Sequence, residues 1–174
     1  MATVTQPITL EEFLARPDRQ DTRREELIEG EIVLSPEPKP LHSEIITRLQ
    51  KALVPLETLG FVVRGGFSCI LPPGSAPGPD LAAIRQERWL EAIRNDAFLQ
   101  GSPELVIEVR SPSNRQLGRK ASLYLQHGAE AVWVVYPKRR AIVNHDQDGA
   151  RESRENEQLE FHGVTVELAA IFCV

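Results

Sequence analysis

One short stretch constrains the fold of this chain more than any other: residues 103–114, which read PELVIEVRSPSN. Its apolar, β-branched run is bounded by a proline and by Ser-Pro-Ser-Asn, a pattern that predicts a buried strand. Glu108 interrupts the run near the carboxyl end of that strand, where an unpaired buried charge is costly. Carboxylates in such positions commonly bind a metal, a cation or a proton. Glu108 is therefore the first candidate functional residue.

A second interpretation of Glu108 stays open. With a period of two residues, Val106, Glu108 and Arg110 share one face of the strand, and that face could simply be solvated. Asp80 favours the functional interpretation, because it follows Pro79 at the head of another short apolar strand. Ligands of open α/β sheets lie just outside the strand ends, so we expect Asp80 and Glu108 to lie on adjacent strands.

Length and composition predict one domain over residues 1–174, since 41% of the residues are apolar and can build a sizeable core. No apolar run approaches the ~20 residues of a membrane-spanning helix. The first residues lack the basic and then apolar pattern of a secretory signal. Cys69 and Cys173 have no metal-ligand spacing, so we expect reduced core thiols in a cytoplasmic protein.

The charge is unevenly distributed along a chain whose net charge is −5, a value that argues against a general nucleic-acid coat protein. Residues 110–140 contain seven bases and one acid, Glu130. The bases are Arg110, Arg115, Arg119, Lys120, Lys138, Arg139 and Arg140. This segment is either a surface that faces a polyanion or an ordinary solvated face, and the sequence supports both interpretations equally.

The order of predicted elements indicates the α/β class, with a parallel strand–helix–strand unit around the central strand and antiparallel hairpins beside it. Capping boxes are predicted at residues 9–12 and 113–116, and hairpins at 26–34 and 141–154. Helices are predicted around residues 45–56, 85–99 and 116–127, and the first should end or kink at Pro55. Further strands are predicted at 61–71, with a bulge at Gly65-Gly66, and at 79–84 and 131–136, followed by a strand and a short helix at 164–174.

Lys120 lies on the helix that follows the central strand. Leu117 is three residues before it and Tyr124 four residues after it, so the three side chains share one apolar face. A lysine on such a face needs a carboxylate or a phosphate as a partner. The alternative is a lysine that extends along the face and escapes to solvent at its edge.

Two carboxylates and a lysine suit the hydrolysis of phosphodiesters. Asp80 and Glu108 are oxygen ligands of the kind that Mg²⁺ prefers, and the carbonyl of Val109 is a candidate third ligand. Bound Mg²⁺, with Mn²⁺ as the alternative ion, would polarise the phosphate and acidify a water molecule. The Lys120 ammonium would orient that water or offset charge on the phosphoryl oxygens.

The chain also resembles a known family, the Uma2 proteins, which are similar to restriction endonucleases of the PD-(D/E)XK group. The matching segments are TLEEFLARP (9–17), ELIEGEIV (26–33), His42, Pro79-Asp80-Leu81-Ala82, PELVIEVRSPSN, the Lys120–Tyr124 pair and HGAEAVWVVYP (127–137). Arg110 stands where the simple signature has lysine, and the lysine of the signature has moved to the helix, at Lys120.

The resemblance implies a mixed four-stranded sheet flanked by helices, to which the N- and C-terminal hairpins would be added. It implies a Mg²⁺-dependent DNA endonuclease that forms homodimers or larger homo-oligomers. The candidate site residues are then Asp80 and Glu108 as metal ligands and Lys120 and Glu26 as catalytic and supporting groups. Two other classes stay open: a catalytically inactive nuclease-fold module that binds nucleic acid or protein, and a structural oligomer whose acids decorate the surface.

Overall fold

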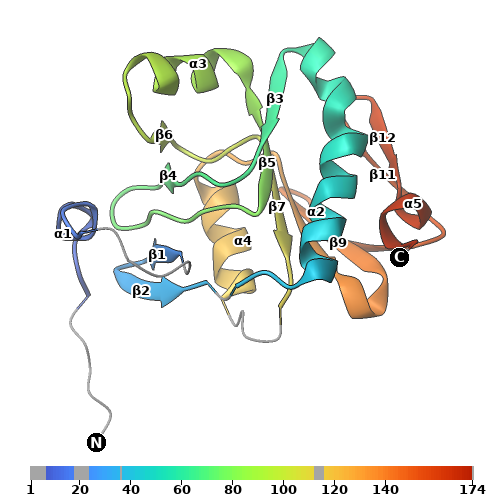
Figure 1. Cartoon of the computed structure of the whole chain (residues 1–174), viewed down its shortest axis with the longest axis horizontal. Helices are drawn as coiled ribbons and strands as arrows, with labels where there is room; N and C mark the ends of the chain where they lie inside the picture. Colours follow the sequence, from blue (N-terminus) through green and yellow to red (C-terminus); the bar gives the residue numbers. More distant parts are fainter. Residues whose placement is uncertain (1–6, 18–23, 36, 112–115, 174) are drawn as a thin grey trace, which may run out of the picture.

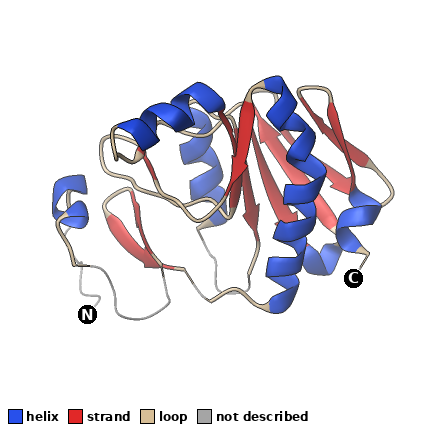
Figure 2. Ribbon diagram, turned by 45° about the horizontal axis from the view of Figure 1, so that its top comes forward, coloured by secondary structure: helices blue, strands red, loops and turns tan. Residues whose placement is uncertain are grey.

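The core of the structure is a mixed β-sheet of six strands in the order β10-β9-β8-β7-β5-β3, with helices on both faces (Figure 1, Figure 2). The computed structural model describes residues 7–17, 24–35, 37–111 and 116–173. The strands of this sheet are β3 (Phe61–Arg64), β5 (Leu81–Arg85), β7 (Leu105–Val109), β8 (Ala131–Tyr136), β9 (Ala141–Asp146) and β10 (Gly149–Arg154). The α/β class is confirmed. The predicted number of strands, four, was too low, because the predicted hairpin β9–β10 pairs with β8 and extends the same sheet.

The central strand β7 lies between β5, to which it is antiparallel, and β8, to which it is parallel. Helix α4 (Leu117–Gln126) connects the parallel pair, as the strand–helix–strand pattern predicts. Every residue of β7 is buried, including Val106 at 0% and Glu108 at 2% exposure. The interpretation of this face as solvated was therefore wrong, because α4 covers it.

Two apolar clusters cover the opposite faces of the sheet, since successive strand residues point to opposite sides. Ile107 packs on one face with α2 (Pro40–Leu53), and Val106 packs on the other face with α4. Figure 2 shows these two helices on either side of the strands. The α-helical part of α2 ends before Pro55 and continues as the 3₁₀ helix η1 (Val54–Leu59), because proline cannot donate the backbone hydrogen bond.

The predicted strand over residues 61–71 is two strands in different sheets. β3 ends at Arg64, and β4 (Cys69–Ile70) pairs with β6 (Leu99–Gln100) away from the main sheet. The chain leaves the sheet at Gly65 and Gly66, where Gly66 has φ 76°. A Cβ at Gly65 would lie 2.5 Å from the Asp80 carbonyl oxygen. The glycine pair therefore ends the strand and also allows a close approach to Asp80.

The N-terminal elements follow their local sequence signals. Helix α1 (Leu10–Leu14) has the predicted capping box, with Thr9 and Glu12 each bonded to the backbone of the other. The hairpin β1 (Glu25–Ile28) and β2 (Glu31–Leu34) turns at Glu29 and Gly30, with φ 50° and 83°. Of the second predicted capping box, residues 113–115 lie outside the described residues.

The predicted helix over residues 85–99 is shorter in the structure, and the tail follows its prediction. Helix α3 (Gln86–Arg94) ends five residues early because Leu99 pairs in β6. The remaining elements are η2 (Pro137–Arg139), β11 (Gln158–Phe161), β12 (Val164–Glu167) and α5 (Leu168–Phe172). Cys69 is buried as expected, but Cys173 is exposed and is not a core thiol. In the described ranges, no helix has both the length and the apolarity needed to span a bilayer.

Candidate functional site

The two predicted metal ligands lie at one end of the sheet. Asp80 immediately precedes β5, which is antiparallel to β7 with Leu81 opposite Ile107. This register places Asp80 beside Glu108, so the expectation that both acids lie on adjacent strands is confirmed. The head of one strand meets the tail of the next because their directions are opposite.

Asp80 is positioned by contacts on both of its carboxylate oxygens. The Val109 N–H donates to Oδ2 at 2.7 Å, and His42 Nε2 lies 3.5 Å from Oδ1. His42 belongs to the first turn of α2, so a helix on the far face of the sheet also contacts this acid. The Asp80 side chain is 28% exposed, which leaves it accessible to a ligand.

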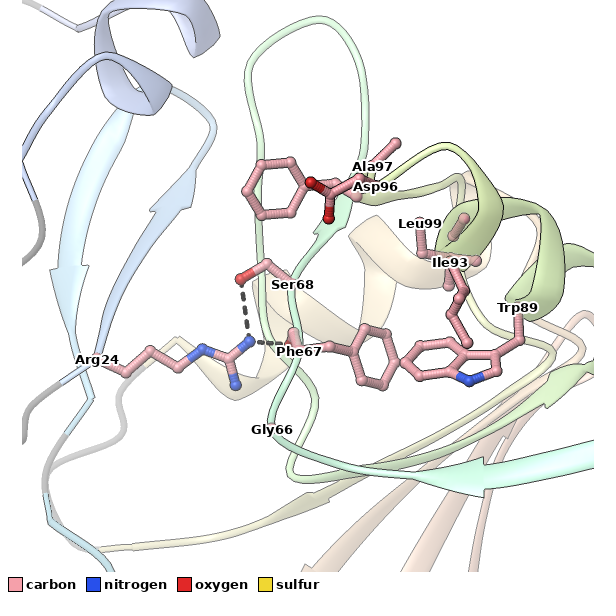
Figure 3. Close-up of a pocket in the computed structure, with 11 residues that line it drawn as sticks. Arg24, Gly66, Phe67, Ser68, Trp89, Ile93, Asp96, Ala97 and Leu99 are labelled. Atoms are coloured by element: carbon pink, nitrogen blue, oxygen red, sulfur yellow. Dashed lines mark hydrogen bonds between the residues drawn. The ribbon is translucent and has the colours of Figure 1, made fainter.

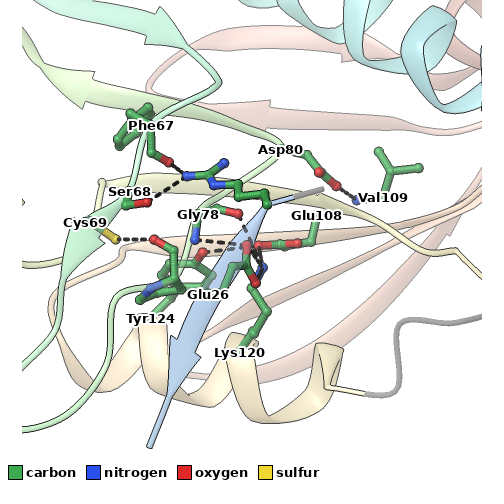
Figure 4. A network of polar contacts seen from close by, with 12 residues as sticks. Glu26, Phe67, Ser68, Cys69, Gly78, Asp80, Glu108, Val109, Lys120 and Tyr124 are labelled. Atoms are coloured by element: carbon green, nitrogen blue, oxygen red, sulfur yellow. Dashed lines mark hydrogen bonds and ion pairs between the residues drawn. The ribbon is translucent and has the colours of Figure 1, made fainter. Parts of the chain in front are cut away.

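Lys120 lies between two glutamates in a buried ion cluster (Figure 4). Its Nζ is 2.6 Å from Glu108 Oε1 and 3.1 Å from Glu26 Oε2. The Lys120 side chain is only 3% exposed, so the interpretation of a lysine that escapes to solvent was wrong. The prediction that this amine finds a carboxylate partner is confirmed.

Glu26 reaches the cluster from β1, far away in sequence. The Gly78 N–H donates to Glu26 Oε1 at 3.1 Å, and the Gly78 carbonyl accepts from Lys120 Nζ at 3.4 Å. Tyr124, one helical turn after Lys120, donates its hydroxyl to Glu108 Oε1 at 3.1 Å. The sequence prediction missed Gly78, although its place two residues before Asp80 in a Pro/Gly loop was a usable signal.

Burial dominates the electrostatics of this cluster. Burial raises the pKa of Glu108 to about 8, although the Lys120 ammonium opposes the shift and Asp80 and Glu26 reinforce it. Burial also lowers the pKa of Lys120, but the carboxylates of Glu108 and Glu26 outweigh it, so the pKa is raised above the ordinary lysine value. Lys120 is therefore an ammonium at neutral pH and cannot accept a proton as a general base.

Comparison with known proteins identifies the family. The model of the Uma2 family, described as "Putative restriction endonuclease", matches residues 10–171. The chain belongs to the Uma2 family. The structure is similar to the crystal structure of a putative nuclease belonging to DUF820 from Anabaena variabilis ATCC 29413. The TM-score is 0.81 at 22% identity, over 96% of this chain and 98% of that one. At this identity the likeness shows the fold alone, and no curated protein matches the chain.

The side chains of this Uma2 site fit a small, hard cation. No group of three or more His, Cys, Asp or Glu side chains with metal-binding geometry occurs among the described residues. Mg²⁺ does not require such a group, because it is usually held by one or two carboxylates together with water and substrate phosphates. Asp80 offers a partly exposed carboxylate and Glu108 a buried one. The donor set of two carboxylates at one sheet end is therefore compatible with Mg²⁺ or Mn²⁺.

The basic segment of the Uma2 chain does not behave as a single surface. Arg119 pairs with Glu29 and Glu31 on the N-terminal hairpin, at 2.8 and 3.0 Å. Arg119 therefore fits the interpretation of a solvated face. Arg110 and Arg139 are different, since both guanidinium groups lie over the ring of Tyr136.

A cavity of about 480 Å³ lies between α3 and the segment before β4 (Figure 3). Arg24 reaches its wall and donates to the Phe67 carbonyl and to Ser68 Oγ, the latter at 3.0 Å. Phe67 and Trp89 pack edge to face at 5.2 Å. Trp89 thus packs against the core cluster that α4 covers.

Proposed function

We propose that this Uma2 chain is a metal-dependent endonuclease that hydrolyses the phosphodiester bonds of DNA. One observation carries the proposal: a buried ammonium, Lys120, is enclosed by Glu108 and Glu26 beside the accessible carboxylate of Asp80. Such clusters of perturbed titratable groups at a strand end are typical of catalytic sites. Membership of a family whose model is described as "Putative restriction endonuclease" supports the same reaction class.

In the proposed mechanism, Asp80 and Glu108 would hold Mg²⁺ or Mn²⁺ at the sheet end. When bound, the ion would polarise the scissile phosphate as a Lewis acid and lower the pKa of a water molecule. The Val109 N–H and His42 would fix the orientation of Asp80, whose side chain is 28% exposed. The Val109 carbonyl is the candidate third ligand.

Lys120 acts in this proposal as a permanent positive charge. Its ammonium fixes one oxygen of Glu108, with Tyr124 as the second donor to that oxygen. The charge offsets the negative charge that develops on the phosphoryl oxygens, an effect that is strong in a buried, poorly solvated site. Glu26 keeps Lys120 in place and needs no contact with the substrate.

The decisive experiment measures cleavage of supercoiled plasmid, linear duplex and single-stranded DNA in Mg²⁺, in Mn²⁺ and in EDTA. Wild type should cut in either metal and not in EDTA. Asp80→Asn and Glu108→Gln should each lose at least ~100-fold in rate, since each removes a ligand charge. Glu160→Gln, which alters an exposed acid of β11, is the matched control and should cut as wild type does.

The rival function is a catalytically inactive module of the same fold. It predicts DNA or protein binding without cleavage, and the same melting temperature for wild type with and without Mg²⁺. Equal cleavage by wild type and Asp80→Asn would instead reveal a contaminating nuclease and would refute the proposed site. A homodimer or larger homo-oligomer, predicted from the resemblance, is checked on the same samples by light scattering.

A further inference from the structure

A pair of arginines shares one aromatic ring at the end of the sheet where the acids lie. Arg110 Cζ is 5.5 Å from the centroid of the Tyr136 ring, and Arg139 Cζ is 4.8 Å from it. Arg110 is exposed and the Arg139 side chain is 54% exposed. These three residues are called the arginine stack below. Guanidinium groups that lie over an aromatic face are held in place while their N–H edges stay open to solvent.

The stack lies on the same face of the sheet as Glu108. β7 and β8 are parallel, with Glu108 opposite Val134, and the Arg110 N–H donates to the Val135 carbonyl at 2.8 Å. The ladder therefore continues past β7 and sets Arg110 opposite Tyr136, two residues beyond Glu108. Tyr136 packs on the cluster that α4 covers, which is the face that Glu108 occupies. Two residues along a strand span about 7 Å.

We propose that the arginine stack grips the phosphate backbone of DNA next to the metal-binding acids and so positions the strand for cleavage. This inference rests on the proposed function and adds the way in which the substrate is held. Arginine pairs with phosphate through two parallel N–H donors, a geometry that lysine lacks. A contact to phosphate carries no base information, so the grip acts on any sequence.

The structure also shows which group competes with the phosphate. The Arg139 guanidinium pairs with Glu152 of β10, and Arg154 Nε lies 3.3 Å from the same acid. Glu152 is an intramolecular anion that already pairs with the Arg139 guanidinium, so a phosphate would have to displace it. Ion pairs this exposed are weak and exchange readily. The proposal therefore predicts opposite effects for the two partners: loss of Arg139 weakens DNA binding, and loss of the Glu152 charge strengthens it.

The test measures binding of a fluorescent 20-base-pair duplex by anisotropy in EDTA, over a series of salt concentrations. Arg110→Ala and Arg139→Ala should each weaken binding about tenfold and lower the slope of log K against log salt by about one. Glu152→Gln should tighten binding. Arg94→Ala, at the exposed end of α3, removes the same charge elsewhere and should leave the slope unchanged.

The variant Arg110→Lys distinguishes an arginine that binds phosphate from one that only packs on the Tyr136 ring. Lysine keeps the charge, so the salt slope should return to the wild-type value while part of the affinity stays lost. A second duplex of unrelated sequence should show the same losses. In cleavage assays, the arginine variants should raise KM while kcat stays near the wild-type value, because the chemical groups are intact.

Unchanged affinity and slope in both alanine variants would overturn the grip, even if wild type cleaves DNA. A slope that falls equally in Arg94→Ala would also overturn it, since only overall charge would then matter. If the alanine variants show reduced salt slopes but wild type cleaves no DNA, the grip is supported while the proposed function fails.

Discussion

Replacing Lys120 with methionine tests the buried cluster directly. Methionine has a similar length and suits a buried helix position, so the change removes the charge and little else. Glu108 and Glu26 would then face each other without the ammonium that now lies 2.6 and 3.1 Å from them. Both carboxylates are buried, at 2% and 3% exposure, so water cannot replace the lost partner.

The size of the effect follows from that burial. Removing one partner of a buried ion pair costs about 3–5 kcal/mol, because the remaining charge is left uncompensated. For a protein of this length each kcal/mol lowers the melting temperature by roughly 2–4 °C, so the expected decrease is on the order of 10 °C.

Thermal melts and urea titrations at pH 7 measure this effect, and Arg119→Met is the matched control. Arg119 is the neighbouring residue of the same helix and also pairs with two glutamates, but it is 41% exposed. Its loss should cost about 1 kcal/mol or less. The double variant Lys120→Met/Glu26→Gln should be more stable than Lys120→Met alone, because it also removes the carboxylate that lies 3.1 Å from the ammonium. The reasoning is refuted if the melting temperature of Lys120→Met lies within 2 °C of wild type, or if Arg119→Met shows an equal decrease. In either case the buried ion cluster does not stabilise the fold as argued.

Three further predictions concern the acids and their support. Asp80→Asn keeps an acceptor for the Val109 N–H, so without metal its free energy of unfolding should lie within ~1 kcal/mol of the wild-type value. The variant should lose any Mg²⁺-induced rise in melting temperature. Glu108 has a pKa of about 8 in the fold against an ordinary 4.5, so the folded state binds its proton more tightly and wild-type stability should fall from about pH 4.5 to 8. In urea titrations, the free energy of unfolding of Glu108→Gln should fall less over this pH range than that of wild type. If both proteins lose stability equally with pH, the prediction is wrong. Gly65→Ala places a Cβ 2.5 Å from the Asp80 carbonyl oxygen and should cost ~1–3 kcal/mol, whereas Gly118→Ala, with open space around it, should be neutral or slightly stabilising.

Local sequence patterns predicted those parts of the fold that local physics controls. The capping box at Thr9 and the turn at Glu29-Gly30 form because hydrogen bonds and φ preferences act within a few residues. The position of Lys120 on an apolar face was also predictable, because Leu117 and Tyr124 lie at helical spacing. The pattern could not name Glu26 as its partner, since the two residues are 94 positions apart. The family resemblance indicated only that Glu26 supports the site, and the Glu26–Lys120 contact itself was not predicted.

The wrong predictions share a cause, which is the tertiary context of a strand. The alternation around Glu108 fits a solvated face and a covered face equally well, and only the packing of α4 decides between them. Residues 61–71 look like one strand because their composition favours strands throughout. The close approach of Gly65 to Asp80, which is a contact between two loops, ends that strand. The sheet has six strands and not four because the hairpin β9–β10 pairs with β8, and local sequence patterns do not determine which strand a hairpin pairs with.

The buried cluster is itself an argument for function. A core that only has to fold gains little from Lys120, Glu108 and Glu26, since well-packed apolar residues of similar volume are often equally stable or more so. The pKa of Glu108, raised to about 8 by burial, shows that its charged form is disfavoured in the metal-free protein. A bound cation beside Asp80 would remove that penalty, because it favours the charged carboxylate. In the proposed function, the cluster gives up some stability so that the sheet end can bind a positive charge.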